Sequence, residues 1–567
     1  MSYSIACETA TYFGPESTPL FGVVHMPDDG KVRGAVVICG SLGKDNSDNV
    51  RGLRLLGDGL AARNILALRF DYLGCGDSSL GQVRPDSAAN WQMSVQHAVD
   101  YASGMGIDDI SAIGVRAGAL ILDSMLPQLT NVRRVVYWDP ASSGRRFLRE
   151  QTAFFKIAAG EDDVPDGVVS TIGARFSAEA AKDFSALRLR PAPDEHVSAR
   201  LVISRANAPD TGVSALISEP RTESIPIDGF SECAQPTRLL PPVALDAVDA
   251  AVLWLDKHLP ERRTHIAPAF ADSARIAVDD SGTVIERIER IEPHGMFAIR
   301  TLPGNASDDA RPVVMFFNNA NNPHYGPNRE WVELSRTVGL LGAEALRWDR
   351  RGAGESGTPS RDGTVFIYSD DGIADAQAAA RHAKRGAQRL QLAGTCSGGW
   401  YSARGGSETH ADSVVLVNEL FWSYRIKKAL QAPIQPGDDD VTDWEQSPRA
   451  RMRRFVQSHL PLWAWHQLGR AGIAQAPEVL LSTLARGGTT TTVILCPADA
   501  ALFQANRGDD ALRRLSKSKH PPRYIEAAGG DHAGFHQSVF IELRRVVKDF
   551  VVSADDTAGA LTAEQGH

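Results

Sequence analysis

The sequence is poor in cysteine, and its cysteines never occur in closely spaced pairs. Six cysteines are spread over 567 residues. Cysteine pairs a few residues apart are typical of zinc sites, and a dense set of cysteines is typical of small secreted domains held by disulfides. Neither pattern is present, and no group of histidines and aspartates has ligand spacing, so we expect a reducing, cytoplasmic setting and no metal or other cofactor. The six are Cys7, Cys39, Cys75, Cys233, Cys396 and Cys496.

Long apolar runs and an excess of positive charge are also missing. No uninterrupted apolar stretch approaches the length of a membrane span, and the first residues lack the basic and apolar segments of a secretory signal. Lysine and arginine number 60 against 69 aspartates and glutamates, which gives a formal net charge of −9. We therefore expect a protein that binds neither nucleic acid nor a membrane. The apolar content of 43% and the charged content of 23% are those of an ordinary globular protein.

The two halves of the chain repeat each other in order and spacing. An Asp-x-x-Gly-x-Gly-x-Ser turn that begins at Asp71 recurs at Asp349, 278 residues later. A Gly-x-x-x-Gly segment that begins at Gly114 recurs at Gly394, 280 residues later. A repeat of this length indicates a duplicated domain, since the repeats of solenoid proteins are only tens of residues long. The chain is also longer than a single hydrophobic core usually supports.

Each half alternates short runs rich in Val, Ile and Leu with longer amphipathic stretches. This pattern indicates an α/β fold, in which a mostly parallel sheet has helices on both faces. We expect two tandem domains at residues 1–265 and 266–552, each with a helical lid insertion. A small polar tail at 553–567 is expected to be disordered. In such sheets the chemistry lies at the carboxyl ends of the strands.

The most informative segment is residues 394–398, Gly-Thr-Cys-Ser-Gly, which follows an apolar run. A Gly-x-nucleophile-x-Gly turn between a strand and a helix holds its central side chain in a strained, exposed position, and its glycines let two backbones approach. The pattern predicts that Cys396 is a nucleophile and that the N–H of Ser397 is an oxyanion donor. A buried cysteine that only packs as a small hydrophobe is the alternative.

An acid and a histidine follow the predicted nucleophile in the order typical of this motif. Asp499 comes after an apolar run, and His532 lies in a glycine-rich loop before the last helical stretch. In a triad, His532 would take the proton of Cys396, and Asp499 would fix the tautomer of the imidazole and stabilise the imidazolium. A resting thiolate–imidazolium pair is expected, because a neighbouring imidazolium favours the thiolate. Glu419, after a different strand, and His536, one helical turn further on, are the alternatives for the acid and the base.

The loop after the apolar run that ends at Phe317 is expected to supply the second oxyanion donor. Asn319 or Ala320 is best placed to do so. The loop continues through His324 and Tyr325, which we predict to contact the substrate. An ordinary polar turn is the alternative for these two residues.

A long insertion at about 422–488 should form a helical lid in the second half. Its aromatic residues, Trp422 among them, could line an apolar acyl pocket, and Trp400 beside the elbow is predicted to contact the substrate too. Most of the aromatic residues are expected only to pack the lid. The basic segment 449–454 could dock an acidic carrier protein, and a solvated helix face is the alternative.

The first half keeps the pattern of the elbow but not its chemistry. Arg116 stands in the place of Cys396, and a protonated guanidinium cannot attack an acyl group. The places of the acid, at 204–207, and of the histidine, at 228–233, hold neither residue. We therefore predict a degenerate hydrolase domain in which Arg116 forms a buried ion pair with Asp139. An anion pocket around Arg116, for a substrate or a phosphopantetheine group, is the alternative.

These motifs make both halves resemble α/β-hydrolase domains over nearly the whole chain. Through residues 394–398, Asp499 and His532, the second half resembles the Dieckmann cyclases and related offloading thioesterases of polyketide and nonribosomal peptide pathways, which have a Cys-His-Asp triad. Through residues 116–118 and 138–140, the first half resembles degenerate hydrolases associated with exosortase systems. The resemblance implies an enzyme of natural-product biosynthesis and leaves its substrate open.

A cysteine nucleophile is well matched to a thioester, because thiol-for-thiol exchange is close to balanced. We predict a covalent acyl-cysteine intermediate, released by cyclisation (Dieckmann-type, or to a lactone or lactam) or by hydrolysis. An acyl thioester is the expected substrate, and an acyl or peptidyl carrier protein with phosphopantetheine is the expected partner. A simple esterase or peptidase and a non-catalytic binding scaffold are the alternatives. A monomer and a homodimer are both compatible with the sequence.

Overall fold

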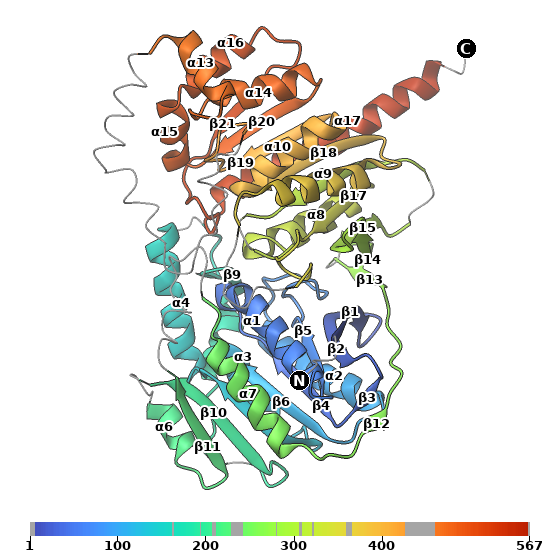
Figure 1. Ribbon diagram of the computed structural model, residues 1–567, viewed down its shortest axis with the longest axis vertical. Coiled ribbons are helices and arrows are strands. Elements are labelled where there is room, and N and C mark those ends of the chain that lie inside the picture. Colours follow the sequence, from blue (N-terminus) through green and yellow to red (C-terminus); the bar gives the residue numbers. More distant parts are fainter. Residues whose placement is uncertain are drawn as a thin grey trace. The chain divides into compact units, whose positions relative to one another are not determined.

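The computed structural model of the protein contains two compact units, whose main division lies between Ile288 and Glu289 (Figure 1). The sequence predicts this boundary earlier, at 265/266. Strand β13 (Ser273–Ala277) precedes this division in the chain but belongs to the second sheet. The compact units and the sheets therefore give different boundaries, and the domain limits stay a prediction. The residues that the structure describes are 6–160, 164–192, 194–206, 211–227, 242–278, 281–305, 309–319, 322–358, 366–425 and 460–564.

The first unit is built on an eight-stranded sheet with the order β1-β2-β5-β4-β6-β7-β10-β11. Strand β2 is antiparallel to β1 and β5, and the other neighbours are parallel. The strands are β1 (Ala6–Phe13), β2 (Leu20–Pro27), β4 (Ala35–Cys39), β5 (Leu66–Phe70), β6 (Ile110–Val115), β7 (Val132–Trp138), β10 (Ala199–Arg205) and β11 (Thr222–Ile227). Two further pairs of short strands are β3 (Lys31–Val32) with β12 (Thr264–His265), and β8 (Val168–Thr171) with β9 (Ala174–Ser177).

The second sheet has nine strands in the order β13-β14-β15-β17-β16-β18-β19-β20-β21. It repeats the order of the first sheet and adds β13 at one edge. Strand β15 is antiparallel to β17, and the strands from β17 to β21 are parallel to their neighbours. The remaining strands are β14 (Thr283–Ile291), β15 (Met296–Pro303), β16 (Pro312–Phe317), β17 (Glu344–Trp348), β18 (Arg389–Thr395), β19 (Ser413–Val417), β20 (Thr490–Leu495) and β21 (Arg523–Glu526).

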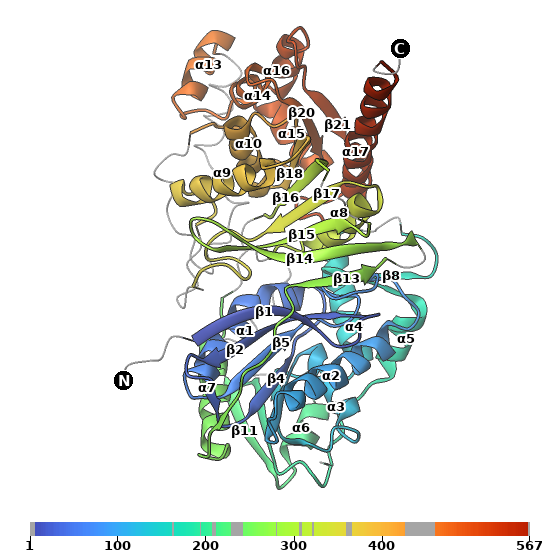
Figure 2. The ribbon, with the colours of Figure 1, turned by 90° about the vertical axis from the view of Figure 1, so that its right-hand side faces the viewer.

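Helices cover both faces of each sheet, because successive side chains of a strand point to opposite faces and both sets are apolar. In β16, Val313 and Met315 belong to the core under helices α9 (Asp370–Lys384) and α10 (Ser397–Thr409), which lie side by side (Figure 2). Val314 belongs to the opposite core, which α8 and α17 cover. In the first unit α2 and α3 cover one face, and α1 and α7 the other. The other helices are α1 (Lys44–Ala61), α2 (Ser87–Gly104), α3 (Ala117–Met125), α4 (Gly144–Ala159), α5 (Ala178–Ala186), α6 (Thr211–Ile217), α7 (Leu245–His258), α8 (Glu330–Leu340), α13 (Leu462–Arg470), α14 (Pro477–Arg486), α15 (Pro497–Ala505), α16 (Gly508–Leu515) and α17 (Ser538–Glu564), with a 3₁₀ turn at Pro327–Arg329.

The repeated Asp-x-x-Gly-x-Gly-x-Ser turn has the same hydrogen bonds in both units. The Ser78 hydroxyl donates to the Asp71 carbonyl oxygen at 2.6 Å, and the Ser356 hydroxyl donates to that of Asp349 at 2.7 Å. The second glycine has a φ of 45° in the first turn and 46° in the second, which favours glycine. The duplication inferred from the sequence therefore extends to the detail of a loop.

The predicted α/β fold is confirmed, since both units have a mostly parallel sheet with helices on its faces. The predicted lid lies partly outside the described residues: α13 and α14 form its described part, whereas residues 426–459, including the basic segment 449–454, are not described. Helix α17 runs to Glu564, so it continues into the segment at 553–567 for which the sequence predicts disorder. None of the described helices is both long and apolar enough to cross a membrane.

Candidate active site

Cys396 lies at the carboxyl end of β18, between the last residue of the strand and the first residue of α10. Its φ of 52° and ψ of −128° are strained for a residue with a side chain, and such outliers gather at functional sites. A Cβ on Gly394 would lie 2.2 Å from the carbonyl oxygen of Gly398, and one on Gly398 would lie 2.5 Å from that of Phe317. Both glycines of the motif are therefore needed for this turn to form.

His532 and Asp499 come together after the last two strands of the sheet. Asp499 is in the first turn of α15, and its Oδ2 lies 2.8 Å from Nδ1 of His532. Burial alone lowers the pKa of His532, but the charge of Cys396 and hydrogen bonds with Asp499 and Cys396 outweigh it and raise the pKa well above its ordinary value. The imidazole is thus held between a carboxylate and the sulfur of the elbow, and both neighbours favour its protonated form.

The two alternatives from the sequence take other positions. Nδ1 of His536 lies 2.9 Å from the hydroxyl oxygen of Ser538 and accepts the N–H of the same residue at 3.2 Å. Asp531 closes this loop, because its carboxylate accepts the backbone N–H groups of Phe535 and His536 at 3.3 and 2.8 Å. The structure therefore brings His532, and not His536, to Asp499.

Glu419 is fully buried near the same centre. Its Oε1 accepts the N–H of Phe421 at 2.7 Å, and burial raises its pKa well above the ordinary value. Among the described residues it has no hydrogen bond with His532. The structure therefore brings Asp499, and not Glu419, into a hydrogen bond with His532.

Asn418 is a buried residue that is not among the candidates named from the sequence. Its side-chain amide is fully buried, and its NH₂ donates to the carbonyl oxygens of Asp531 at 2.9 Å and His532 at 3.1 Å. Its side-chain oxygen accepts the N–H of Cys496 at 2.9 Å. Asn418 thus ties the end of β19 to the loop of His532 and to the start of the segment that carries Asp499. Its place one residue after a predicted strand end is the signal that could have found it.

The predicted oxyanion donors lie at or beside the elbow. Ser397 is the first residue of α10, and the loop of Asn319 follows β16, whose last carbonyl groups contact Gly398. Asn319 is buried. Ala320 lies outside the described residues, and the role of all three as oxyanion donors stays a prediction.

The residues predicted to contact substrate are mostly buried. His324 is bound to Asp349, with 2.7 Å between its Nδ1 and the carboxylate, and its ring packs on Phe297. Trp400 and Trp422 are fully buried, and the indole N–H of Trp400 donates to the carbonyl oxygen of Ser423 at 2.7 Å. Substrate contact by these three residues finds no support in their placement. Tyr325, whose ring packs against that of His324, is half-buried beside them.

A small pocket, partly open to solvent, lies beside the elbow. Two of its lining residues, Phe317 and Asn318, have carbonyl groups that lie close to Gly398. Its polar side chains come from the loop after β16, from the loop after β17 and from helix α10. The lining residues are Phe317, Asn318, Asn322, Trp348, Arg350, Ala353, Gly372 and Tyr401.

In the first unit Arg116 has the backbone angles of a nucleophile elbow, and its side chain lies among carboxylates. It is buried, and its guanidinium contacts the carboxylates of Asp45 at 3.0 Å, Asp139 at 3.4 Å and Glu150 at 2.7 Å. Burial lowers the pKa of Arg116, but these three charges outweigh it and raise the pKa. The predicted ion pair with Asp139 is confirmed. The alternative, an anion pocket, finds no support in this placement, because three carboxylates already surround the guanidinium and would repel an anion.

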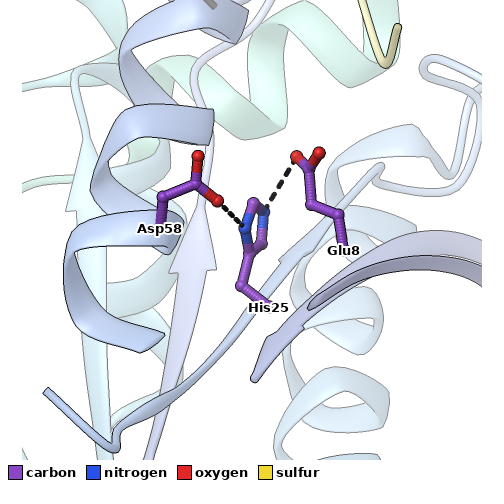
Figure 3. A group of neighbouring side chains, drawn as sticks. All are labelled: Glu8, His25 and Asp58. Atoms are coloured by element: carbon purple, nitrogen blue, oxygen red, sulfur yellow. Dashed lines mark hydrogen bonds and ion pairs between the residues drawn. The ribbon is translucent and has the colours of Figure 1, made fainter. Parts of the chain in front are cut away.

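One other group of side chains has the composition of a metal site. Glu8, His25 and Asp58 lie close together in the first unit (Figure 3). However, Nδ1 of His25 contacts Asp58 at 2.9 Å, and Nε2 accepts the N–H of Arg69 at 2.8 Å. Burial and the charge of Arg69 lower the pKa of His25, and Glu8 is paired with Arg54 at 2.6 Å. Both ring nitrogens are in use and two arginines repel a cation, so these residues do not fit a metal.

The order of strands and the strained elbow define the α/β-hydrolase fold in both units. No protein-family model and no curated protein sequence matches this chain. Solved structures with a similar fold include Est1E from Butyrivibrio proteoclasticus with ferulic acid bound, at 16% identity and a TM-score of 0.35, covering 44% of this chain and 98% of that one. A monoglyceride lipase from Saccharomyces cerevisiae has 15% identity and a TM-score of 0.33, covering 46% and 98%. A dienelactone hydrolase from Anabaena variabilis has 10% identity and a TM-score of 0.28, covering 49% and 96%.

Proposed function

We propose that the second unit is an acyl-transfer enzyme with Cys396 as nucleophile, His532 as general base and acid, and Asp499 as the residue that orients His532. The observation that carries the proposal is the joint placement of the three: Cys396 at a strained elbow, and His532 bound to Asp499 at 2.8 Å with its pKa raised by Cys396. Coincidence would not put the three groups in the order and contacts of a triad.

The first half-reaction forms an acyl-enzyme. The sulfur of Cys396 attacks the carbonyl carbon of a thioester, and the carbonyl oxygen becomes an oxyanion that backbone N–H groups near Ser397 and Asn319 stabilise. When the oxyanion collapses, the bond to the leaving sulfur breaks and the leaving thiolate takes the proton of His532. Cys396 then carries the acyl group as a new thioester.

The second half-reaction releases the acyl group. His532, now neutral, takes a proton from an internal carbon, nitrogen or oxygen nucleophile of the acyl chain, or from water. That atom forms a bond to the carbonyl carbon, and the bond to the sulfur of Cys396 breaks. An internal nucleophile gives a ring and water gives an acid, and in both cases the thiolate–imidazolium pair is restored.

The reactivity of the Cys396 sulfur indicates the class of substrate. Exchange of one thiol for another is close to balanced, whereas an ester or amide must be driven uphill to reach an acyl-cysteine. We therefore favour a thioester, such as one carried on the phosphopantetheine of an acyl or peptidyl carrier protein, as substrate and partner.

Intact-protein mass spectrometry tests the proposal. The wild type incubated with a short acyl-N-acetylcysteamine thioester should gain the mass of one acyl group, and Cys396→Ala should gain none. Asp499→Asn should acylate about a thousandfold more slowly, because the imidazole loses its orienting partner. An acyl adduct that persists in Cys396→Ala, or a folded wild type that never acylates with any thioester of a series, would show that the proposal is wrong.

Hydrolysis by water is the second candidate, because a pocket that is partly open to solvent lies beside the elbow. Turnover of simple aryl esters separates the two outcomes. A hydrolase should release acid repeatedly, whereas a cyclase should acylate once and release slowly into water. A non-catalytic scaffold would label at Cys396 no faster than at Cys39 or Cys75.

A further inference from the structure

A carboxyl group without a charged partner lies beneath the nucleophile elbow. Glu419 follows β19 by two residues and is fully buried. Its Oε1 accepts the N–H of Phe421 at 2.7 Å, and its Oε2 has no hydrogen-bond partner among the described residues. No described arginine or lysine forms an ion pair with it. A carboxylate in such a position loses its hydration and gains no ion pair with arginine or lysine in return, which favours the neutral acid.

The helix of the elbow leaves room for this carboxyl. A Cβ on Gly399 would lie 2.7 Å from Oε2 of Glu419 and 3.2 Å from the carbonyl oxygen of Gly394. Gly399 is helical, so it is not needed for a left-handed turn. Its missing side chain instead lets Oε2 lie between the first turn of α10 and the sheet, three residues from Cys396 in sequence.

The groups that face Glu419 come from three segments. Cys396 approaches from the elbow and His532 from the loop before α17, and the charges of both act on Glu419. Tyr368 approaches from the segment before α9, and its ring packs on Phe421 with 4.7 Å between centroids. Burial raises the pKa of Glu419 first, the charge of Cys396 raises it further, and His532 opposes them.

We propose that Glu419 is a positioning residue that stays a neutral carboxylic acid beneath the elbow, so that it adds no negative charge beside the sulfur of Cys396. This inference rests on the proposed function. It adds a proton on Glu419, which is not a member of the triad. Negative charges on Cys396 and Glu419 would oppose each other, so a charge on Cys396 favours the protonated form of Glu419.

Infrared difference spectroscopy of the full-length protein tests the protonation directly. The wild type minus Glu419→Gln should show the C=O stretch of a protonated carboxyl at neutral pH. In Cys396→Ala the same band should disappear at a lower pH than in the wild type, by about one pH unit, because the opposing charge is gone. Glu330→Gln is the matched control: Glu330 is also buried but pairs with Arg544, so its removal should leave the band in place.

Three results would overturn the proposal. They are the absence of a protonated-carboxyl band at neutral pH, a band whose titration is the same in Cys396→Ala, and a loss of acylation in Glu419→Gln as large as in Asp499→Asn. We expect Glu419→Gln to cost at least about tenfold less acylation rate than Asp499→Asn, since Glu419 does not orient His532. If Glu419→Gln does not fold, the comparison of the wild type with Cys396→Ala still tests the proposal, because both proteins keep Glu419. The band does not depend on acyl transfer, so a coupled band in a protein that fails to acylate would refute the proposed function and not this inference.

Discussion

The two strand-to-helix elbows of the molecule have nearly the same backbone and opposite chemistry. Arg116 has φ 53° and ψ −112°, and Cys396 has φ 52° and ψ −128°. Each donates its N–H to the last residue of the next strand, Trp138 at 3.0 Å and Val417 at 2.9 Å. The strained turn is therefore a property of the fold that persists without a nucleophile. One side chain separates an elbow that can attack from one that cannot.

A second difference lies at the end of the following strand. Asp139 and Asn418 occupy matching places, with φ of 43° and 48°, and each donates its N–H to the strand beyond. In the first unit this residue is a carboxylate that binds Arg116 and Arg205. In the second it is an amide that binds the loop of His532. The same position closes a charge cluster in one unit and holds the loop of His532 in the other.

Removing Arg116 should have the largest effect on stability. Arg116→Ala leaves three buried carboxylates without their shared cation, so we expect the free energy of unfolding of the first unit to fall by about 4 kcal/mol. Denaturant unfolding measures it. Arg134→Ala, which removes a more exposed pair with Asp109, is the control and should cost less than about 1 kcal/mol. A loss below about 1 kcal/mol for Arg116→Ala would show that the cluster does not hold the degenerate elbow.

Asn418→Ala should lower the acylation rate of Cys396 by about tenfold to a hundredfold, because His532 is then held less accurately. Stopped acylation reactions followed by mass spectrometry give the rate, and the pH dependence of thiol labelling shows whether His532 is affected. Asn131→Ala is the control, since Asn131 binds only Ser103 in the first unit. A change smaller than threefold would mean that the loop of His532 keeps its place without Asn418.

Glu289 in strand β14 should make the stability of the second unit depend on pH in the acid range. Burial alone raises the pKa of Glu289, but a hydrogen bond from His382 and the charge of Arg300 outweigh it and lower the pKa to about 2 from 4.5. Because the folded pKa is the lower one, its contribution of about 3 kcal/mol is complete above pH 4.5 and is lost as the pH falls towards 2. Glu289→Gln should therefore be less stable than the wild type at pH 6, and the difference should shrink in denaturant titrations at lower pH. A difference that does not depend on pH would contradict the ion pair, and exposed Glu526→Gln is the control.

The smallest effect is expected at the surface of the second unit. Arg381 and Glu408 form an exposed pair at 2.7 Å between α9 and α10. Arg381→Ala should change the free energy of unfolding by less than about 0.5 kcal/mol, because water and salt screen the pair. A loss above about 1 kcal/mol in thermal unfolding would show that the packing of α9 against α10 depends on this ion pair as well as on their buried alanines.

The sequence was enough to predict the fold, the elbow and the order of the groups that meet there. These depend on local spacing: an apolar run, two glycines and a residue between them determine the turn around Cys396. The choice of Asp499 over Glu419, and of His532 over His536, depends on how distant loops fold back, which spacing does not contain. The burial of His324 against Asp349 and the clamp by Asn418 have the same origin, since each joins segments that only the folded sheet brings together.

The serine of the repeated turn has a consequence for measurements of motion. Ser78 accepts the backbone N–H of Phe21 at 2.9 Å, and Ser356 accepts that of Phe297 at 2.8 Å. Each unit therefore contains, at equivalent places, one buried amide whose deuterium uptake requires the same turn to open. The two amides can be compared directly, because they occupy the same position in the two turns. Their uptake rates report separately how often the second unit and the first unit open to water, within one chain and one experiment.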